Sequence, residues 1–118
     1  MGYAVNDHGE RPWGFWHVDE VHDGYIVKTI TVKPGGVLSL QSHKHRSEIW
    51  EITEGFAEVT VGTTVMQLTI GETVEIPVNT LHRLANFSDS LLIVKEKQFG
   101  DILDEDDIVR YEDIYGRG

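Results

Sequence analysis

Residues 35–55 read GGVLSLQSHKHRSEIWEITEG, and this stretch decides the fold class because polar side chains alternate within an apolar, strand-forming segment. Side chains of a strand point to its two faces in turn, so a strand over 37–45 places Gln41, His43 and His45 on one face. Amide and imidazole groups on the inner face of a β-barrel cost free energy unless a partner satisfies them, and a metal ion is such a partner. The stretch therefore predicts a barrel with a metal site in its mouth.

Two more candidate ligands lie further along the chain. Glu48 follows the bend at 46–47, and from there its carboxylate can return to the same site. Residues 71–86 read GETVEIPVNTLHRLAN, in which Pro77 stops one strand and His82 begins the next. The candidate ligands of one divalent metal ion are thus Gln41, His43, His45, Glu48 and His82, and strand alternation alone does not choose between Gln41–His43 and His43–His45 as the pair. Nitrogen and oxygen ligands without sulfur suit zinc, manganese, iron, cobalt or nickel, and the sequence does not choose among these metals.

Most of the remaining chain is typical of short strands separated by turns. Gly62 and Thr63 predict a tight hairpin, and a second strand pair is expected around Ser88 and Asp89. Residues 104–111 suit either one helical turn or a strand that docks on the barrel. The expected strands cover 25–32, 37–45, 48–53, 56–61, 64–70, 73–76, 82–86 and 91–97. This spacing predicts an all-β sandwich or barrel.

Length and charge narrow the classes of function. The 118 residues suit one domain, which we divide into an N-terminal arm (1–23), a barrel core (24–97) and an acidic C-terminal segment (98–118). A net charge of −10 opposes binding to nucleic acid. The chain has no cysteine, which excludes disulfides and thiolate metal sites. It shows neither a secretory signal nor the roughly 18 to 20 apolar residues of a membrane helix, so we expect a cytoplasmic protein without membrane contact.

Two motifs resemble those of the cupin superfamily, whose fold is a double-stranded β-helix or jelly-roll barrel. The first is carried by Gly35, Gln41, His43, Glu48 and Gly55, a spacing that the pair His43–His45 would break. The resemblance therefore implies Gln41, His43 and Glu48 as metal ligands, with His82 from the second motif. The second is carried by Gly71, Pro77, His82 and Asn86, with Asn79 where the superfamily has glycine. Asparagine is the next best residue after glycine for a left-handed turn, so Asn79 is expected to keep the turn.

A closer resemblance runs from about residue 11 to 117. The segments 11–14, 38–48, 76–77, 82–86, 105–110 and 115–117 are similar to the C-terminal domain of type II mannose-6-phosphate isomerase/GDP-mannose pyrophosphorylase. The resemblance implies a metal-dependent isomerase that interconverts mannose 6-phosphate and fructose 6-phosphate. The pyrophosphorylase half of the family is absent from this sequence, so nucleotide-sugar synthesis is not implied. Ile49 stands where the family has histidine, and residues 51–54 also depart from its pattern.

The isomerase hypothesis assigns roles beyond the ligand set. His45 is the first candidate for the base that moves a proton between neighbouring carbons. Arg46 and Arg83 each stand beside a proposed ligand and are interpreted either as a phosphate clamp or as surface ion pairs. Lys28 and Lys44 have the same two interpretations. The alternatives are a sugar-binding cupin without catalysis and another metal-dependent cupin enzyme, such as a dioxygenase. Because cupin sheets leave edges and apolar faces, we expect a homodimer.

Overall fold

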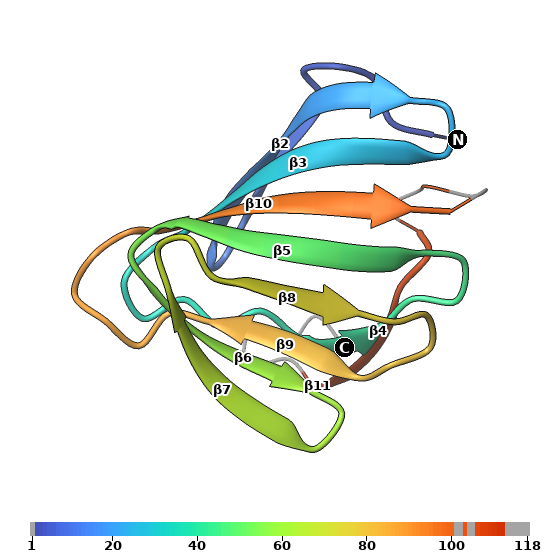
Figure 1. The fold of residues 1–118 in the computed structure, drawn as a ribbon. Coiled ribbons are helices and arrows are strands. Elements are labelled where there is room, and N and C mark those ends of the chain that lie inside the picture. Colours follow the sequence, from blue (N-terminus) through green and yellow to red (C-terminus); the bar gives the residue numbers. More distant parts are fainter. Residues whose placement is uncertain (1, 101–102, 104–105, 113–118) are drawn as a thin grey trace.

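The protein folds into two antiparallel β-sheets that pack face to face (Figure 1). The computed structural model describes residues 2–100, 103 and 106–112. One sheet has the order β1-β2-β3-β10-β5-β8, and the other has the order β11-β4-β9-β6-β7. The strands are β1 (His8–Arg11), β2 (Gly14–His22), β3 (Tyr25–Val32), β4 (Leu40–Ser42), β5 (Ser47–Glu54), β6 (Phe56–Val61), β7 (Thr64–Thr69), β8 (Thr73–Ile76), β9 (His82–Ala85), β10 (Leu92–Phe99) and β11 (Val109–Glu112). The expected all-β architecture is confirmed.

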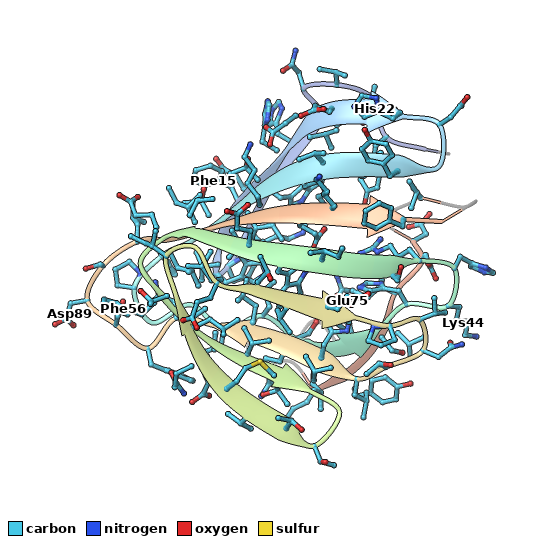
Figure 2. The ribbon with its side chains drawn as sticks, viewed as in Figure 1. Phe15, His22, Lys44, Phe56, Glu75 and Asp89 are labelled. Atoms are coloured by element: carbon cyan, nitrogen blue, oxygen red, sulfur yellow. The ribbon has the colours of Figure 1, made fainter. Side chains whose placement is uncertain are left out.

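The core lies between the sheets because each long strand alternates buried and exposed side chains. In β10 the buried positions are Leu92, Val94, Glu96 and Gln98, with more exposed residues between them. The inner face of this strand is thus apolar at one end and polar at the other. Figure 2 shows the loop that carries Lys44 and the loop that carries Asp89 at opposite ends of the barrel. The polar end of β10 lies toward the Lys44 end, because Phe99 pairs with Ser47.

Backbone conformation confirms two turns expected from the sequence. Val61 pairs with Thr64 across a two-residue turn, and Gly62 at its start has a φ of 62°. Asn79 has a φ of 57°, so asparagine holds the left-handed turn where the superfamily has glycine. The turn brings the Asn79 backbone N–H to the carbonyl oxygen of His43 at 2.8 Å, which ties the two motif regions together.

The strand expected over 37–45 is much shorter than predicted. Only Leu40–Ser42 pairs as β4, and residues 43–46 form a loop. The pair expected around Ser88 and Asp89 is also wrong, because β9 and β10 belong to different sheets. The chain crosses between the sheets there, and Asn86 holds the crossover by donating its side-chain N–H groups to the carbonyl oxygens of Val32, Lys33 and Ser90.

Both chain ends add strands to the sheets. The segment predicted as an N-terminal arm contains β1 and β2, and its Trp13 and Trp16 are buried in the core. Residues 104–111 were expected to form either a helical turn or a docked strand. The docked strand is confirmed for the described residues, because β11 pairs with β4. Tyr115, Gly116 and Arg117, which also carried the family resemblance, lie outside the described residues. No helix long and apolar enough to cross a membrane occurs in the described part of the chain.

Candidate metal centre

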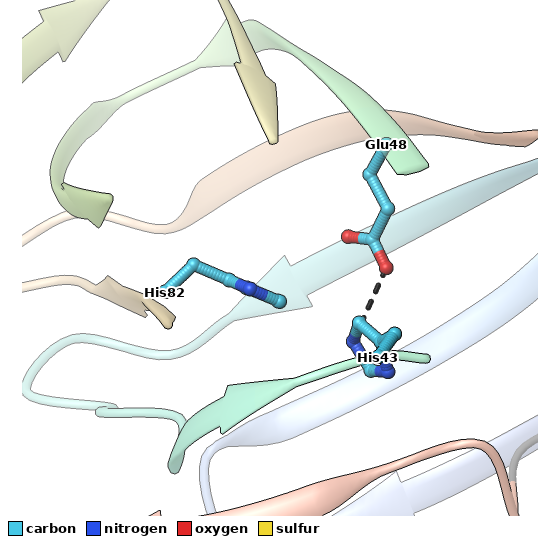
Figure 3. Close-up of side chains that lie close together, drawn as sticks. All are labelled: His43, Glu48 and His82. Atoms are coloured by element: carbon cyan, nitrogen blue, oxygen red, sulfur yellow. Dashed lines mark ion pairs between the residues drawn. The ribbon is translucent and has the colours of Figure 1, made fainter. Parts of the chain in front are cut away.

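Three predicted ligands come together at the polar end of the barrel (Figure 3). His43 lies in the loop after β4, Glu48 is the second residue of β5, and His82 is the first residue of β9. One ligand atom from each lies within 4.8 Å of the others, and the residues are only 3%, 1% and 2% exposed. A buried cluster of two imidazoles and one carboxylate is a donor set that zinc, manganese, iron, cobalt or nickel accepts.

Hydrogen bonds to the backbone set the tautomers of both histidines. Nδ1 of His43 donates to the carbonyl oxygen of Asp107, and Nδ1 of His82 donates to that of Thr80 at 2.9 Å. Each Nε2 then carries a lone pair. His43 Nε2 lies 3.2 Å from Glu48 Oε2, so its lone pair points into the cluster. An N–H donated to a backbone carbonyl is the usual support of a metal-ligating histidine. The residues therefore fit a metal ion.

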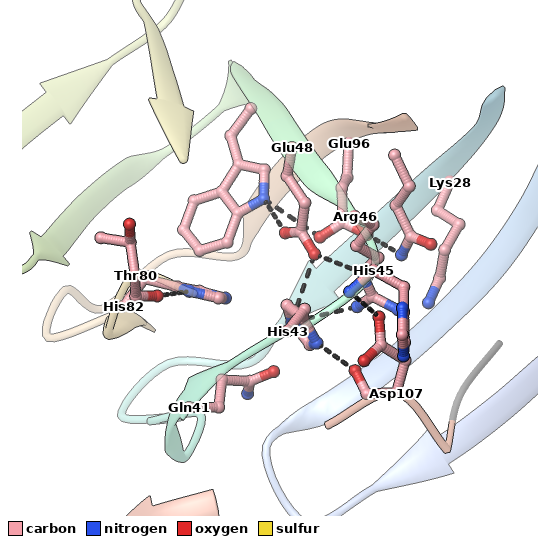
Figure 4. A network of polar contacts seen from close by, with 12 residues as sticks. Lys28, Gln41, His43, His45, Arg46, Glu48, Thr80, His82, Glu96 and Asp107 are labelled. Atoms are coloured by element: carbon pink, nitrogen blue, oxygen red, sulfur yellow. Dashed lines mark hydrogen bonds and ion pairs between the residues drawn. The ribbon is translucent and has the colours of Figure 1, made fainter. Parts of the chain in front are cut away.

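Glu48 is held as an anion by two donors. Arg46 Nε donates to Glu48 Oε2 at 2.7 Å, and Trp50 Nε1 donates to Glu48 Oε1 at 2.8 Å (Figure 4). Burial is the largest influence on the pKa of Glu48 and would raise it, but the surrounding positive charges, Arg46 first, together outweigh burial and hold that pKa well below its usual range. Burial lowers the pKa of His43 from 6.5 to about 4, which keeps the imidazole neutral and available as a ligand.

Gln41 belongs to the same end of the barrel. It is the direct cross-strand partner of His82, so the two side chains share the inner face of the sheet. The Gln41 amide nitrogen donates to Ser39 Oγ at 2.9 Å, which orients the amide and leaves its oxygen as the acceptor. Gln41 lines the same cavity as the three clustered ligands.

The cavity opens to solvent and encloses a volume of about 70 Å³. Besides the ligands, four cationic side chains and one further carboxylate line it, namely Arg11, Lys28, Arg46, Arg110 and Glu96. Glu96 is 4% exposed, and burial together with the nearby charge of Glu48 raises its pKa from 4.5 to about 8. This cavity contains a cluster of candidate metal ligands and more cationic than acidic side chains among its described residues. It therefore suits a small anionic molecule whose oxygen atoms can bind a metal ion.

Two predicted site residues lie elsewhere. His45 is exposed and is not among the residues that line the cavity, because β4 ends at Ser42 and strand alternation does not continue to it. Arg83 follows His82 in β9 and points to the other face, where it donates to the carbonyl oxygens of Leu38 and Glu112. Arg46 does line the cavity, but as the partner of Glu48.

Several residues of the site were not predicted. Glu96 was not predicted from the sequence as a site residue. The alternation of Leu92, Val94, Glu96 and Gln98 is the signal that places it on the core face. Asp107 was counted with the acidic tail, yet its carboxylate accepts the backbone N–H groups of Lys44 and His45 at 2.9 and 3.0 Å. No sequence signal joins positions that lie more than sixty residues apart.

Comparison with known proteins agrees with the geometry. Residues 3–113 match the family model described as mannose-6-phosphate isomerase C-terminal. The chain is 49% identical over 107 residues to xanthan biosynthesis protein XanB of Xanthomonas campestris, and 47% identical over 107 residues to alginate biosynthesis protein AlgA of Pseudomonas putida. Each match covers 91% of this chain but only 23% and 22% of the relative, so the chain spans less than a quarter of their length.

Solved structures show the same fold at low sequence identity. Oxalate decarboxylase of Lactobacillus farciminis matches with a TM-score of 0.76 and 20% identity, over 88% of this chain and 33% of that one. KdgF of Halomonas sp. matches with a TM-score of 0.71 and 16% identity, over 85% and 89% of the two chains. At these identities the likeness concerns the fold alone. The family match, which covers nearly the whole chain, shows that this protein belongs to the mannose-6-phosphate isomerase C-terminal family of cupin domains.

Proposed function

We propose that the chain is a metal-dependent aldose–ketose isomerase that converts mannose 6-phosphate to fructose 6-phosphate. The observation that carries this proposal is the buried cluster of His43, Glu48 and His82 inside a cationic cavity, in a member of this family. The relatives are named for xanthan and alginate biosynthesis, and one is a mannose-1-phosphate guanylyltransferase of Salmonella typhimurium. A mannose phosphate as substrate is consistent with these names.

In this proposal Gln41, His43, Glu48 and His82 hold one divalent ion through amide oxygen, imidazole Nε2 and carboxylate oxygen. The bound ion would supply a Lewis acid for the carbonyl and hydroxyl oxygens of the sugar. Arg46, whose guanidinium lies within hydrogen-bond distance of His43 and Glu48, would help to stabilise negative charge on those oxygens. The cavity positions the sugar and limits the access of water.

The isomerisation moves one proton from C2 of the aldose to C1, while a hydroxyl proton passes from O2 to O1. The base must line the cavity. Because His45 does not, we assign the transfer between carbons to Glu96, a carboxyl group outside the ligand set. The charge of a bound divalent ion would lower the Glu96 pKa from about 8 and so favour the carboxylate form that a base requires. Glu96 shares the N–H of Trp50 with Glu48 and therefore lies beside the cluster.

A coupled assay with mannose 6-phosphate tests the proposal directly. The protein is stripped of metal and then reloaded separately with zinc, manganese, iron, cobalt and nickel ions. We expect activity with at least one metal, no activity without metal, and no activity in His82→Ala. Inactivity with every metal, in protein shown to retain it, would refute the isomerase assignment.

The departure from the family at Ile49 would favour a sugar-binding cupin without catalysis if it removed a histidine from the cavity. Ile49 alternates with Glu48 along β5 and is 36% exposed on the outer face of the strand. Histidine is therefore missing from the outer face of the sheet and not from the cavity. This position gives no reason to infer a loss of catalysis.

Two further proposals concern the state of the protein in the cell. We propose a homodimer, supported by large exposed apolar side chains such as Phe56 and Phe87, which are 61% and 65% exposed. Light scattering at micromolar concentration tests it, and a monomer mass would contradict it. Because sugar phosphates are cytoplasmic metabolites, the proposed substrate implies a cytoplasmic protein.

A further inference from the structure

Two buried hydrogen-bond donors of the cavity have no partner among the described residues, 2–100, 103 and 106–112. They are Nε of Arg110, on β11, and Nε1 of Trp16, on β2. Leaving a buried donor unsatisfied costs about 1 to 3 kcal/mol, and more for a charged group. Both residues line the cavity, Trp16 from the six-stranded sheet and Arg110 from the five-stranded sheet, so a molecule bound there can supply acceptors that the described residues do not.

Trp16 stands within a group of cations on the six-stranded sheet. The Lys28 ammonium lies 4.4 Å from the centroid of the Trp16 ring, and Cζ of Arg11 lies 5.6 Å from it. The point where a Cβ on Gly9 would stand is 2.6 Å from Trp16 Nε1 and 2.9 Å from Arg11 Nη1. Because glycine has no Cβ, these two side chains can pack directly against the backbone of β1.

Arg110 approaches from the opposite sheet, in a row with two of the proposed ligands. It pairs with Gln41 across β11 and β4, and Gln41 pairs with His82 across β4 and β9. Neighbouring strands lie about 4.8 Å apart, so Arg110 is about 10 Å from His82 along the sheet. The row thus runs from the metal cluster to a guanidinium within one cavity.

The charge of the cavity contrasts with that of the molecule. The chain has a net charge of −10, but among the described residues the cavity is lined by four cationic side chains and two carboxyl groups. Arg46 is engaged by Glu48. The other cations that line the cavity are Arg11, Lys28 and Arg110. They can attract an anion that the overall field repels, and guanidinium groups match phosphate oxygens in geometry.

We propose that Arg110, Lys28, Arg11 and the indole N–H of Trp16 form a subsite for the phosphate dianion of a phosphate monoester. The inference rests on the proposed function and replaces the clamp expected from Arg46 and Arg83. The phosphate lies at the β11 side of the cavity and the opposite end of the sugar lies at the metal cluster. A hexose 6-phosphate has this polarity, with its phosphate at the end of the chain away from the carbonyl carbon.

The test is calorimetric binding by the metal-loaded chain, with fructose 6-phosphate, fructose and inorganic phosphate as probes. We expect fructose 6-phosphate and inorganic phosphate to bind, and both to weaken roughly tenfold or more in Arg110→Gln, the loss typical of a hydrogen bond to a charged group. Arg110→Lys should retain part of the affinity. Trp16→Phe, which keeps the ring and removes the N–H, should weaken the same two probes and leave fructose unchanged.

Lys97→Gln is the matched control, because it removes one positive charge from the exposed face of β10. Equal phosphate affinity in Arg110→Gln and Lys97→Gln would overturn the subsite, and so would an equal loss for fructose and fructose 6-phosphate. Phosphate binding that depends on Arg110 without any isomerase activity would refute the proposed function alone. Isomerase activity whose KM is unchanged in folded Arg110→Gln would refute the subsite alone.

Discussion

Nε of Arg46 donates to Oε2 of Glu48 at 2.7 Å, and this pair is the electrostatic centre of the site. The two side chains are 6% and 1% exposed, so water screens their attraction little. The same guanidinium also reaches Nε2 of His43 at 3.1 Å. In the metal-free chain Arg46 therefore neutralises a carboxylate that a metal ion would otherwise neutralise.

Arg46→Met should destabilise the metal-free protein strongly. Removing one partner of a buried ion pair typically costs about 3 to 5 kcal/mol, because the other charge stays buried without compensation. Here Glu48 would also remain beside Glu96. Since a bound divalent ion restores the lost positive charge, added metal should raise the melting temperature more in the variant than in the parent. Equal metal-induced shifts in thermal denaturation would contradict this account of Arg46.

Loss of either buried imidazole should empty the metal site without unfolding the barrel. His43→Ala and His82→Ala remove ligands from the polar end, whereas the apolar core between the sheets does not contain them. We expect elemental analysis to find no retained metal in either variant, with the β-sheet circular dichroism spectrum preserved. Full metal content in either variant would refute the ligand assignment.

Gln41 and His45 provide a sharper comparison, because the sequence places both on one face of a strand and the structure separates them. Gln41 lines the cavity opposite His82, and His45 is exposed outside it. Gln41→Ala should weaken metal binding roughly tenfold or more, on the scale of losses around metal sites. His45→Ala should leave metal affinity unchanged in a competition titration with a chelator. The reverse result would show that the loop rearranges to make His45 a ligand.

The stability of the metal-free protein should depend on pH through Glu96. The pKa of this buried carboxyl is raised to about 8 in the folded state, against 4.5 as its ordinary value. Between these values the folded state binds more protons than the unfolded state, so this contribution to stability is present below about pH 4.5 and is lost as pH rises to about 8. His43 acts in the opposite direction, since its folded pKa of about 4 makes stability rise with pH from about 4 to 6.5.

Glu96→Gln isolates the contribution of Glu96 to the pH dependence of stability. The amide does not titrate, so the loss of stability between about pH 6.5 and 8 should be smaller in the variant than in the parent. Urea denaturation at several pH values, after dialysis against a chelator, measures it. Parallel pH profiles for the two proteins would show that Glu96 titrates normally.

The sequence predicted the parts of this fold that depend on local rules. Gly62 and Asn79 hold their turns because backbone conformation is a property of short segments. His43, Glu48 and His82 come together as expected, because motif spacing follows the order of the strands and loops that bear them. His45 was misplaced because strand alternation was carried past Ser42, where the chain leaves the sheet.

Long-range pairing accounts for the remaining misses. At the crossover near Asn86 the chain passes from β9 in one sheet to β10 in the other. The local turn residues do not determine whether the next strand pairs in the same sheet or joins the other one. Glu96 and Arg110 have charged side chains of the kind usually found at the surface. They line the cavity because their strands pair with β5 and β4, and this pairing joins distant parts of the chain.

The last prediction concerns Asp107, which connects the C-terminal segment to the metal centre. Its carboxylate accepts the backbone N–H groups of Lys44 and His45 at 2.9 and 3.0 Å, and its carbonyl oxygen accepts the Nδ1–H of His43. The side chain thus fixes the loop of residues 43–46, and the backbone of the same residue fixes the ring of one ligand.

Asp107→Ala should therefore loosen the loop and reduce metal affinity while leaving every proposed ligand in the chain. The carbonyl acceptor remains, but it is no longer held against His43 by the two side-chain bonds. Loss of such outer support typically costs about 10- to 100-fold in metal affinity. Hydrogen exchange should accelerate at the amides of Lys44 and His45, the two donors that lose their acceptor. Asp89→Ala, at the opposite end of the barrel, removes an equal charge and should change neither quantity. If the Lys44 and His45 amides keep their protection in Asp107→Ala, the carboxylate does not organise the loop, and any loss of metal must come from charge alone.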